Sequence, residues 1–152
     1  MYKKLKDLRK SKKGFTLVEL IVVLVILAIL AAILVPALLG YIEKAKEKQI
    51  TTNANAAYVA VQSLLDEQYG VASETDKPSD ISKANITKLT SITTLGTITA
   101  STGAATGKDS FKLVSFSYSE AGKTVYITST GNWTTDSTKG VAVTTNTLTF
   151  VS

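Results

Sequence analysis

The stretch Lys12-Lys13-Gly14-Phe15-Thr16-Leu17-Val18-Glu19-Leu20 decides how the N-terminal part of this chain is built. Basic residues precede Gly14, and an apolar run opens with Phe15 and contains one charged residue, Glu19. The uncharged residues 20–39 would form a helix of about 30 Å, which matches the hydrocarbon core of a bilayer. A lone carboxylate at the edge of such a segment is costly unless it finds a partner. The stretch therefore predicts a membrane-spanning helix whose acid is satisfied by assembly with other copies.

With these residues the chain resembles the type IV pilin family, including its pseudopilin and competence-pilin relatives. The resemblance rests on residues 13–20, on the apolar continuation and on Pro36, and it covers roughly the first third of the chain. In that family a membrane peptidase removes the basic leader and methylates the new amino terminus. The resemblance therefore implies cleavage between Gly14 and Phe15, followed by N-methylation of Phe15.

Basic residues are concentrated in the leader. Residues 1–14 hold seven Lys or Arg and one Asp, which gives +6, so the remainder of this +5 chain carries −1. The basic leader should stay in the cytoplasm, which leaves residues 41–152 on the outer side of the membrane. A nucleic-acid-binding domain would instead spread its basic residues over a folded face, and no direct nucleic-acid partner is predicted.

Two other interpretations of residues 1–40 compete with a cleaved precursor. A secretory signal peptide needs a shorter apolar core and a small-residue cleavage site, and this run offers neither. An unprocessed membrane anchor for a binding domain fits the length of the span. The anchor differs from a prepilin because residues 1–14 would remain attached and Glu19 would be dispensable.

Glu19 has two predicted roles that are compatible with each other. Thr16 and Glu19 have the spacing of a capping box, which marks a helix start. In the pilin interpretation, Glu19 of one subunit also neutralises the amino terminus of Phe15 in its neighbour, which offsets the cost of burying either charge alone. Later in the run, Pro36 predicts a kink. The resemblance implies that the helix bends or locally melts near Pro36 and Gly40 in a filament.

After Gly40 the sequence predicts an amphipathic helix. A charged collar at 43–48 is followed by apolar residues at helical spacing, and Gly70 is a helix stop. Polar residues at 51–55 weaken this helix and leave a break as an alternative. Residues 15–69 would otherwise form one helix of about 80 Å. The apolar stripe consists of Ile50, Ala54, Ala57, Tyr58, Val61, Leu64 and Leu65.

The remaining residues, 71–152, are rich in Thr and Ser and predict a small antiparallel sheet. Alternation at Val114, Phe116 and Tyr118 indicates one packed face, which should meet the helix stripe. The predicted fold is α+β: a long N-terminal helix, membrane-spanning in its first half and amphipathic in its second, packed on this sheet. The predicted segments are a leader (1–14), a spanning helix (15–40), an amphipathic helix half (41–70) and a β-sheet head (71–152). Within the head we expect a loop at 71–85, strands at 86–100, 111–119, 124–130 and 141–151, and a hairpin turn at 120–123.

No catalytic, cofactor or metal site is predicted, so the chain is not expected to be an enzyme. It contains no Cys and no His, which removes thiol chemistry, the commonest general base and the commonest metal ligand. Many members of the pilin family carry a C-terminal disulfide loop. Because this chain has no Cys, interactions other than a disulfide must hold its C-terminal region in place.

The predicted function is that of a structural subunit of a type IV pilus-like surface filament. The chain would enter the cytoplasmic membrane as a single-pass, N-in precursor surrounded by lipid. It would then polymerise by head-to-tail contacts that grow as a helix, giving an extracellular homo-oligomer. The resemblance implies a prepilin peptidase and methyltransferase as a partner, with an assembly platform and ATPases acting indirectly. A pseudopilin, or a minor or competence pilin of a secretion or DNA-uptake system, is the structural alternative.

Overall fold

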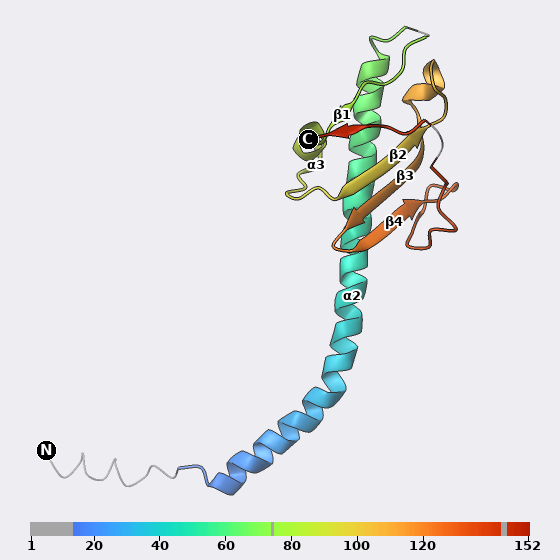
Figure 1. Ribbon diagram of the computed structural model, residues 1–152. Helices are drawn as coiled ribbons and strands as arrows, with labels where there is room; N and C mark the ends of the chain where they lie inside the picture. The colour runs from blue at the N-terminus through green and yellow to red at the C-terminus, as the bar shows by residue number, and fades with distance from the viewer. Residues whose placement is uncertain (1–13, 74, 144–145) are drawn as a thin grey trace, which may run out of the picture. The chain divides into compact units, whose positions relative to one another are not determined.

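The computed structural model describes residues 14–73, 75–143 and 146–152 (Figure 1). Of the predicted leader, only Gly14 belongs to these described residues. The chain divides into two units at residue 43, and each is described by itself. Helix α2 (Leu17–Tyr69) supplies the long helix of the predicted α+β fold.

Helix α2 ends where the sequence predicts and has no break. The Gly70 N–H donates to a carbonyl oxygen four residues earlier, at 3.1 Å, and the helix ends at Tyr69. At 51–55, the side-chain hydroxyls of Thr51 and Thr52 each donate to a carbonyl oxygen four residues earlier, at 2.9 Å. These bonds satisfy the threonines inside the helix, so the alternative of a break is wrong for this structure.

The second unit contains a four-stranded antiparallel sheet in the order β2-β3-β4-β5. The predicted hairpin is confirmed: β3 and β4 are joined by a two-residue turn at Ala121 and Gly122, with φ of 51° and 76°. Positive φ at both positions is the conformation that matches the twist of the flanking strands. The strands are β2 (Thr97–Thr102), β3 (Leu113–Glu120), β4 (Lys123–Ile127) and β5 (Trp133–Thr134), with the 3₁₀ turn η1 (Lys108–Phe111) between β2 and β3.

One hydrophobic core joins the second half of α2 to the inner face of this sheet. Large side chains of the sheet, including Phe116 and Tyr118, pack against a helix stripe that contains three alanines. Tyr58 and Leu64 are partly buried beside that stripe. The predicted packing of helix on sheet, and with it the α+β fold, is therefore confirmed. The buried residues of α2 are Ile50, Ala54, Ala57, Ala60, Val61 and Leu65.

A β-bulge changes the side-chain alternation at the start of β3. The pairing of β3 with β2 shifts between Ser101 and Thr102, which leaves Val114 as the extra residue. Leu113 is therefore buried together with Phe116, whereas Val114 is exposed. The predicted inward position of Val114 is wrong for this reason.

The strand predicted at 86–100 is wrong over its first half, and the loop predicted at 71–85 ends too late. Strand β1 (Ile81–Ser82) and helix α3 (Lys83–Thr90) occupy this region. Within α3, Ile86 is completely buried, and the Thr87 and Thr90 hydroxyls donate to carbonyl oxygens one turn earlier. Burial of Ile86 and these local bonds outweigh the strand preference of a Thr- and Ile-rich sequence.

Backbone pairing holds the C-terminal residues against β1 and β2. Strand β6 (Phe150–Val151) pairs in parallel with β1, and the Leu148 N–H donates to the Ala100 carbonyl oxygen at 2.9 Å. The C-terminal segment thus runs from the edge of β2 to β1 (Figure 1). Of the strand predicted at 141–151, only its end is a strand, and residues 144–145 lie outside the described residues.

Candidate processing and assembly site

The predicted cleavage point lies immediately ahead of helix α2. Gly14, Phe15 and Thr16 are exposed and precede the first helical residue, Leu17. The Phe15 side chain is 88% exposed, and apart from Gly14 and its chain neighbours no heavy atom of the described residues lies within 4 Å of the position of a Cβ on Gly14. The Gly14–Phe15 peptide bond is therefore unobstructed in the described chain, while its cleavage stays a prediction.

Glu19 forms the capping box that the spacing predicts. The backbone N–H of Thr16 donates to Glu19 Oε2 at 2.8 Å, and the Thr16 hydroxyl donates to the same oxygen at 2.9 Å. In return, the Glu19 N–H donates to Thr16 Oγ1 at 3.2 Å. These reciprocal bonds satisfy donors that have no partner inside the helix. The helix start is therefore fixed within one chain, whatever else Glu19 contacts.

The capping box engages only one of the two carboxylate oxygens of Glu19. Both bonds from Thr16 end on Oε2, and no hydrogen bond or ion pair to Oε1 is present among residues 14–73, 75–143 and 146–152. An ionised carboxylate accepts hydrogen bonds at both oxygens, so the cap leaves capacity for a further donor. Sequence spacing predicts the partner of Glu19, but it carries no signal for which oxygen remains open.

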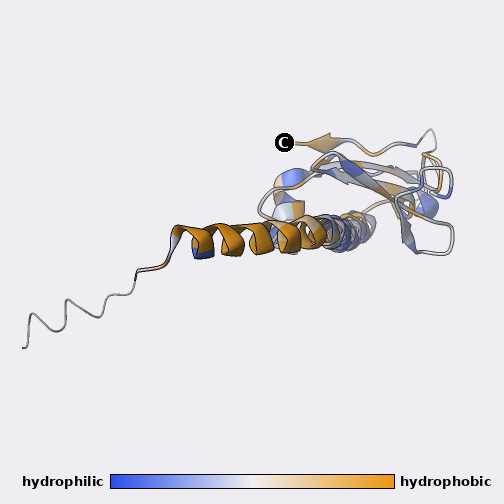
Figure 2. Ribbon diagram, turned by 90° about the horizontal axis from the view of Figure 1, so that it is seen from below, coloured by the Kyte–Doolittle hydropathy of each residue, from blue (hydrophilic) through white to orange (hydrophobic). Residues whose placement is uncertain are grey.

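The segment that follows Glu19 is apolar on every side of the helix (Figure 2). All described residues of the first unit are exposed, and the large side chains from Leu20 to Leu39 are about half exposed or more. Helix α2 is long and apolar enough in this part to cross a membrane, by length and composition. A surface helix of a soluble domain would instead carry one polar face.

Pro36 and Gly40, the predicted positions of kinking or melting, both lie inside α2. The helix is continuous through them in this single chain. Pro36 lacks the N–H that a helix interior uses, and a Cβ placed on Gly40 would meet no atom within 4 Å other than those of its chain neighbours and of the adjacent helix backbone. A change at these two residues on assembly remains a prediction, because one copy of the chain does not test it.

Groups of side chains suited to metal binding are absent from the part of the chain that the structure describes. No three Asp or Glu residues come together there in a way that would hold an ion. Four aspartates of the second unit, Asp76, Asp80, Asp109 and Asp136, form no such group. The chemistry of the candidate site therefore consists of one peptide bond, one carboxylate and an apolar surface.

Comparison with known proteins gives one match. A family model described as the prokaryotic N-terminal methylation motif matches residues 9–35. No curated protein and no solved structure matches the chain. The matched range contains Gly14, Phe15, Thr16 and Glu19, the residues whose geometry is given above. The chain therefore carries, at residues 9–35, the N-terminal methylation motif that is the hallmark of type IV pilins and prepilin-like proteins.

Proposed function

We propose that this chain is a structural subunit of a type IV pilus-like filament. It enters the membrane with its N-terminus in the cytoplasm, is cut between Gly14 and Phe15, is N-methylated at Phe15, and polymerises through α2. The observation that carries this proposal is the fully exposed apolar segment of α2 with Glu19 in its first turn. The methylation motif at residues 9–35 supports the same assignment.

The apolar segment needs a non-aqueous environment at every stage. Each large side chain that is removed from water contributes roughly 1.5–3 kcal/mol, so the segment is not stable in solution. Lipid covers it in the precursor, and α2 helices of neighbouring copies cover it in the filament. Because lipid is as apolar as leucine, moving from lipid to a neighbouring helix brings no further hydrophobic gain. Close packing and polar contacts must then drive the assembly step.

Glu19 supplies the polar contact in this proposal. Cleavage before Phe15 creates a positively charged amine, and Glu19 Oε1 is the carboxylate oxygen that the capping box leaves open. The Phe15 amine and the Glu19 carboxylate of one chain lie at the same end of α2. Each of the two groups can therefore pair with the opposite charge of a neighbouring copy. Either charge alone in an apolar surrounding is unfavourable, and pairing offsets that cost. In this arrangement residues 15–40 line the filament core and residues 71–152 form the outer head.

Mass spectrometry of the protein isolated from its own cells tests the processing step. We expect a mature chain that begins at N-methylated Phe15, with residues 1–14 removed. A chain that keeps its leader would support the unprocessed anchor instead. A pseudopilin or a minor pilin would give the same terminus. Abundant long surface fibres would favour the major subunit, and short rods would favour the alternative.

Substitution of Glu19 tests the pairing step. Glu19→Ala should insert into the membrane normally but form few or no fibres, because the new amine of Phe15 loses its partner. Glu19→Gln keeps a capping box, since Gln also fits this position, but it removes the charge. We expect Glu19→Gln to fail in the same way, as measured by filament yield in electron micrographs. Glu43→Ala, also exposed on α2, is the matched control. Normal fibres from Glu19→Gln would show that filament formation depends on the capping box and not on the charge of Glu19.

A further inference from the structure

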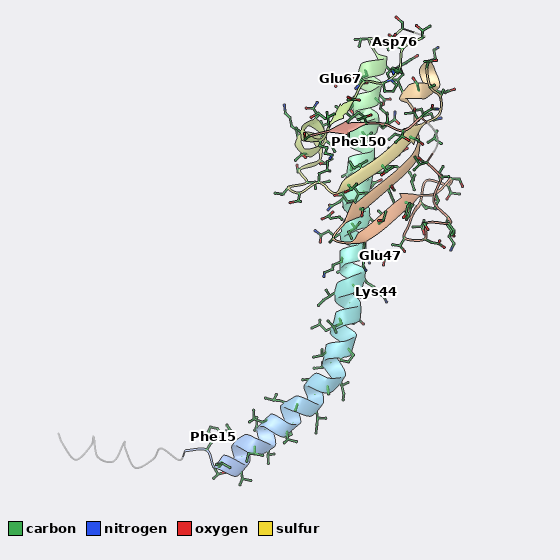
Figure 3. All side chains as sticks on the ribbon, in the orientation of Figure 1. Phe15, Lys44, Glu47, Glu67, Asp76 and Phe150 are labelled. Atoms are coloured by element: carbon green, nitrogen blue, oxygen red, sulfur yellow. The ribbon has the colours of Figure 1, made fainter. Side chains whose placement is uncertain are left out.

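The C-terminal residues of the chain form one extended strand. Half-buried and exposed side chains alternate without interruption from Asn146 to Val151, which is the period of a β-strand. The half-buried side chains of Leu148 and Phe150 pack against the core of the second unit, and Phe150 is labelled on β6 in Figure 3. We call residues 146–151 the closing strand, of which β6 is the end.

The two edges of the closing strand pair with two different strands. On one edge, the Leu148 N–H donates to the Ala100 carbonyl oxygen of β2 at 2.9 Å. On the other edge, the Thr149 carbonyl oxygen accepts the Ile81 N–H of β1 at 3.0 Å. In a pleated strand, neighbouring residues direct their backbone groups to opposite edges, as these two bonds do. The closing strand therefore lies between β1 and β2 (Figure 1).

Both neighbouring strands depend on the closing strand. Within the described chain, β1 pairs with β6 and with no other strand. Ile81 and Ala100 are almost completely buried, so water does not readily replace the backbone bonds that they make with the closing strand. Without it, β1 and β2 would both present open edges, and an open edge recruits other extended chains. The sheet therefore contains a slot whose filling completes two edges at once.

We propose that this slot is a binding site for an extended peptide, that its occupant is the closing strand, and that it is filled last when the head (residues 71–152) folds. Recognition is by strand addition, in which backbone hydrogen bonds give affinity and alternate side chains give specificity. The slot takes the apolar side chains of Leu148 and Phe150, while Thr147 and Thr149 face outward.

Sequence separation supports this order of folding. The closing strand pairs with β1 across 69 positions, from Ile81 to Phe150, whereas β3 and β4 are joined by a short turn. Pairing of distant residues loses more chain entropy, so it follows the formation of local hairpins. Because the closing strand lies at the C-terminal end, it can enter the slot after β1 and β2 are in place.

Export gives this order a consequence, which rests on the proposed function. A chain whose N-terminus stays in the cytoplasm crosses the membrane from residue 41 towards its C-terminus, so the closing strand emerges last. An incompletely exported chain therefore keeps an open slot. The head becomes complete only when the whole chain has crossed, and filament assembly requires that complete head.

The order of folding can be measured on the full-length wild-type chain. During refolding in detergent, pulsed hydrogen exchange read by NMR should show that the Ile81 and Leu148 amides gain protection after the amides of the β3–β4 hairpin. These two amides should gain protection together, because one event forms both of their bonds. Protection of Ile81 and Leu148 before the hairpin, or at the same time, would overturn the proposal.

A proline in the closing strand tests whether the slot must be filled. Leu148→Pro removes the N–H that bonds to Ala100. We expect normal membrane insertion, loss of most filaments, and about tenfold faster trypsin cleavage at Lys83 and Lys88 of α3, because cleavage follows the population of the open head. Ser152→Pro, which is exposed and lies beyond β6, is the matched control and should behave as wild type. Wild-type trypsin resistance in Leu148→Pro would contradict the inference.

A peptide added in trans separates filling of the slot from a general loss of stability. A synthetic peptide of residues 146–152, in large excess, should restore trypsin resistance to the detergent-solubilised Leu148→Pro chain, whose own closing strand cannot pair fully. The same peptide with Leu148→Pro should not restore it. Equal effects of the two peptides would show that the slot does not recognise the closing strand.

The proposed slot and the proposed function can fail separately. Wild-type and Ser152→Pro chains that form no filaments would defeat the filament proposal. The exchange and peptide measurements need no filament, so they decide the slot on their own. Filaments that form at wild-type yield from Leu148→Pro would leave the filament proposal intact and overturn the requirement for a complete head.

Discussion

The hydroxyl of Tyr118 links three parts of the second unit at a fully buried position. Its oxygen accepts the Gly96 N–H at 2.9 Å and donates to Glu120 Oε2 at 3.0 Å. The same Glu120 oxygen accepts the side-chain N–H of Asn53 from α2 at 2.9 Å. Gly96 is required there, because a Cβ at this residue would collide with the Ser119 carbonyl oxygen and contact the Tyr118 ring. The Tyr118 hydroxyl thus joins the β1–β2 connection to the sheet, and Glu120 continues the link to α2.

Removing this hydroxyl should destabilise the folded state measurably. In Tyr118→Phe the ring still fills the core, but the Gly96 N–H loses its partner, which costs about 1–3 kcal/mol. We expect the free energy of unfolding to fall by that amount in denaturant titrations of the detergent-solubilised chain. Tyr126→Phe, on the outer face of the sheet, is the control and should change it by less than about 0.5 kcal/mol. An equal loss in both variants would show that the buried bond contributes nothing specific.

The contribution of Tyr118 should also depend on pH. Burial raises the pKa of Tyr118 above its usual value near 10, and the Glu120 carboxylate adds to this, while the bond from Gly96 opposes it. Above about pH 10 the unfolded chain therefore releases a proton that the folded chain retains, which favours unfolding. The stability difference between wild type and Tyr118→Phe should be constant below about pH 9 and shrink as the pH rises through the folded pKa. A constant difference up to pH 11 would contradict this.

At the scale of elements, one glutamine side chain joins α2 to the start of β3. Gln62 Nε2 donates to the Phe111 carbonyl oxygen at 3.0 Å, and the Leu113 N–H donates to Gln62 Oε1 at 3.0 Å. The amide thus pairs with the strand as a neighbouring strand would. Since β3 begins at Leu113 and a bulge follows at Val114, this pairing holds the strand where its ladder to β2 is irregular.

Gln62→Ala should weaken this end of the sheet more than the rest of it. Two partly buried backbone groups lose their partner, which should lower the free energy of unfolding by about 1–3 kcal/mol. Hydrogen exchange followed by NMR should show faster exchange at the Leu113 amide, with little change in the β3–β4 hairpin. Gln49→Ala is the matched control on the same helix, because Gln49 is exposed and makes no side-chain hydrogen bond within the described residues. Unchanged protection at Leu113 would refute the proposed role of Gln62.

Elements with a repeating pattern or a defined cap could be predicted from the sequence, whereas those that depend on tertiary contacts could not. Helix α2 has a periodic stripe and a glycine stop, and the β3–β4 hairpin has a Gly-containing turn. Helix α3 begins a Thr- and Ile-rich stretch, and the burial of Ile86 together with the local bonds of two threonine hydroxyls favours the helix there. The bulge at Val114 is invisible in the sequence, because it arises from the pairing of two strands.

The candidate site was predictable to a similar extent. The spacing of Thr16 and Glu19 predicts the capping box, because its two partners are local in sequence. That both bonds converge on one carboxylate oxygen depends on side-chain rotamers, which spacing does not fix.

At the scale of the whole molecule, the two units are stabilised by different surroundings. Every buried apolar residue of the described chain lies between Ile50 and Ile127, within the second unit. The described residues of the first unit, 14–43, contribute none. The core of the second unit is therefore complete without the apolar segment. The large apolar side chains of the first unit, in contrast, stay exposed in the described chain.

Residues 44–152 should accordingly fold alone as a soluble monomer. Because no core contact is removed, we expect a cooperative thermal transition by circular dichroism within a few degrees of that of the full chain in detergent. Sedimentation should give a monomer that forms no filaments, since the apolar segment through which we propose that the chain polymerises is absent. In the fragment, Leu65→Ala should lower the free energy of unfolding by about 2–5 kcal/mol, which confirms that the transition reports on this core. An aggregated or non-cooperative fragment would mean that residues 15–43 support the fold as well as the assembly.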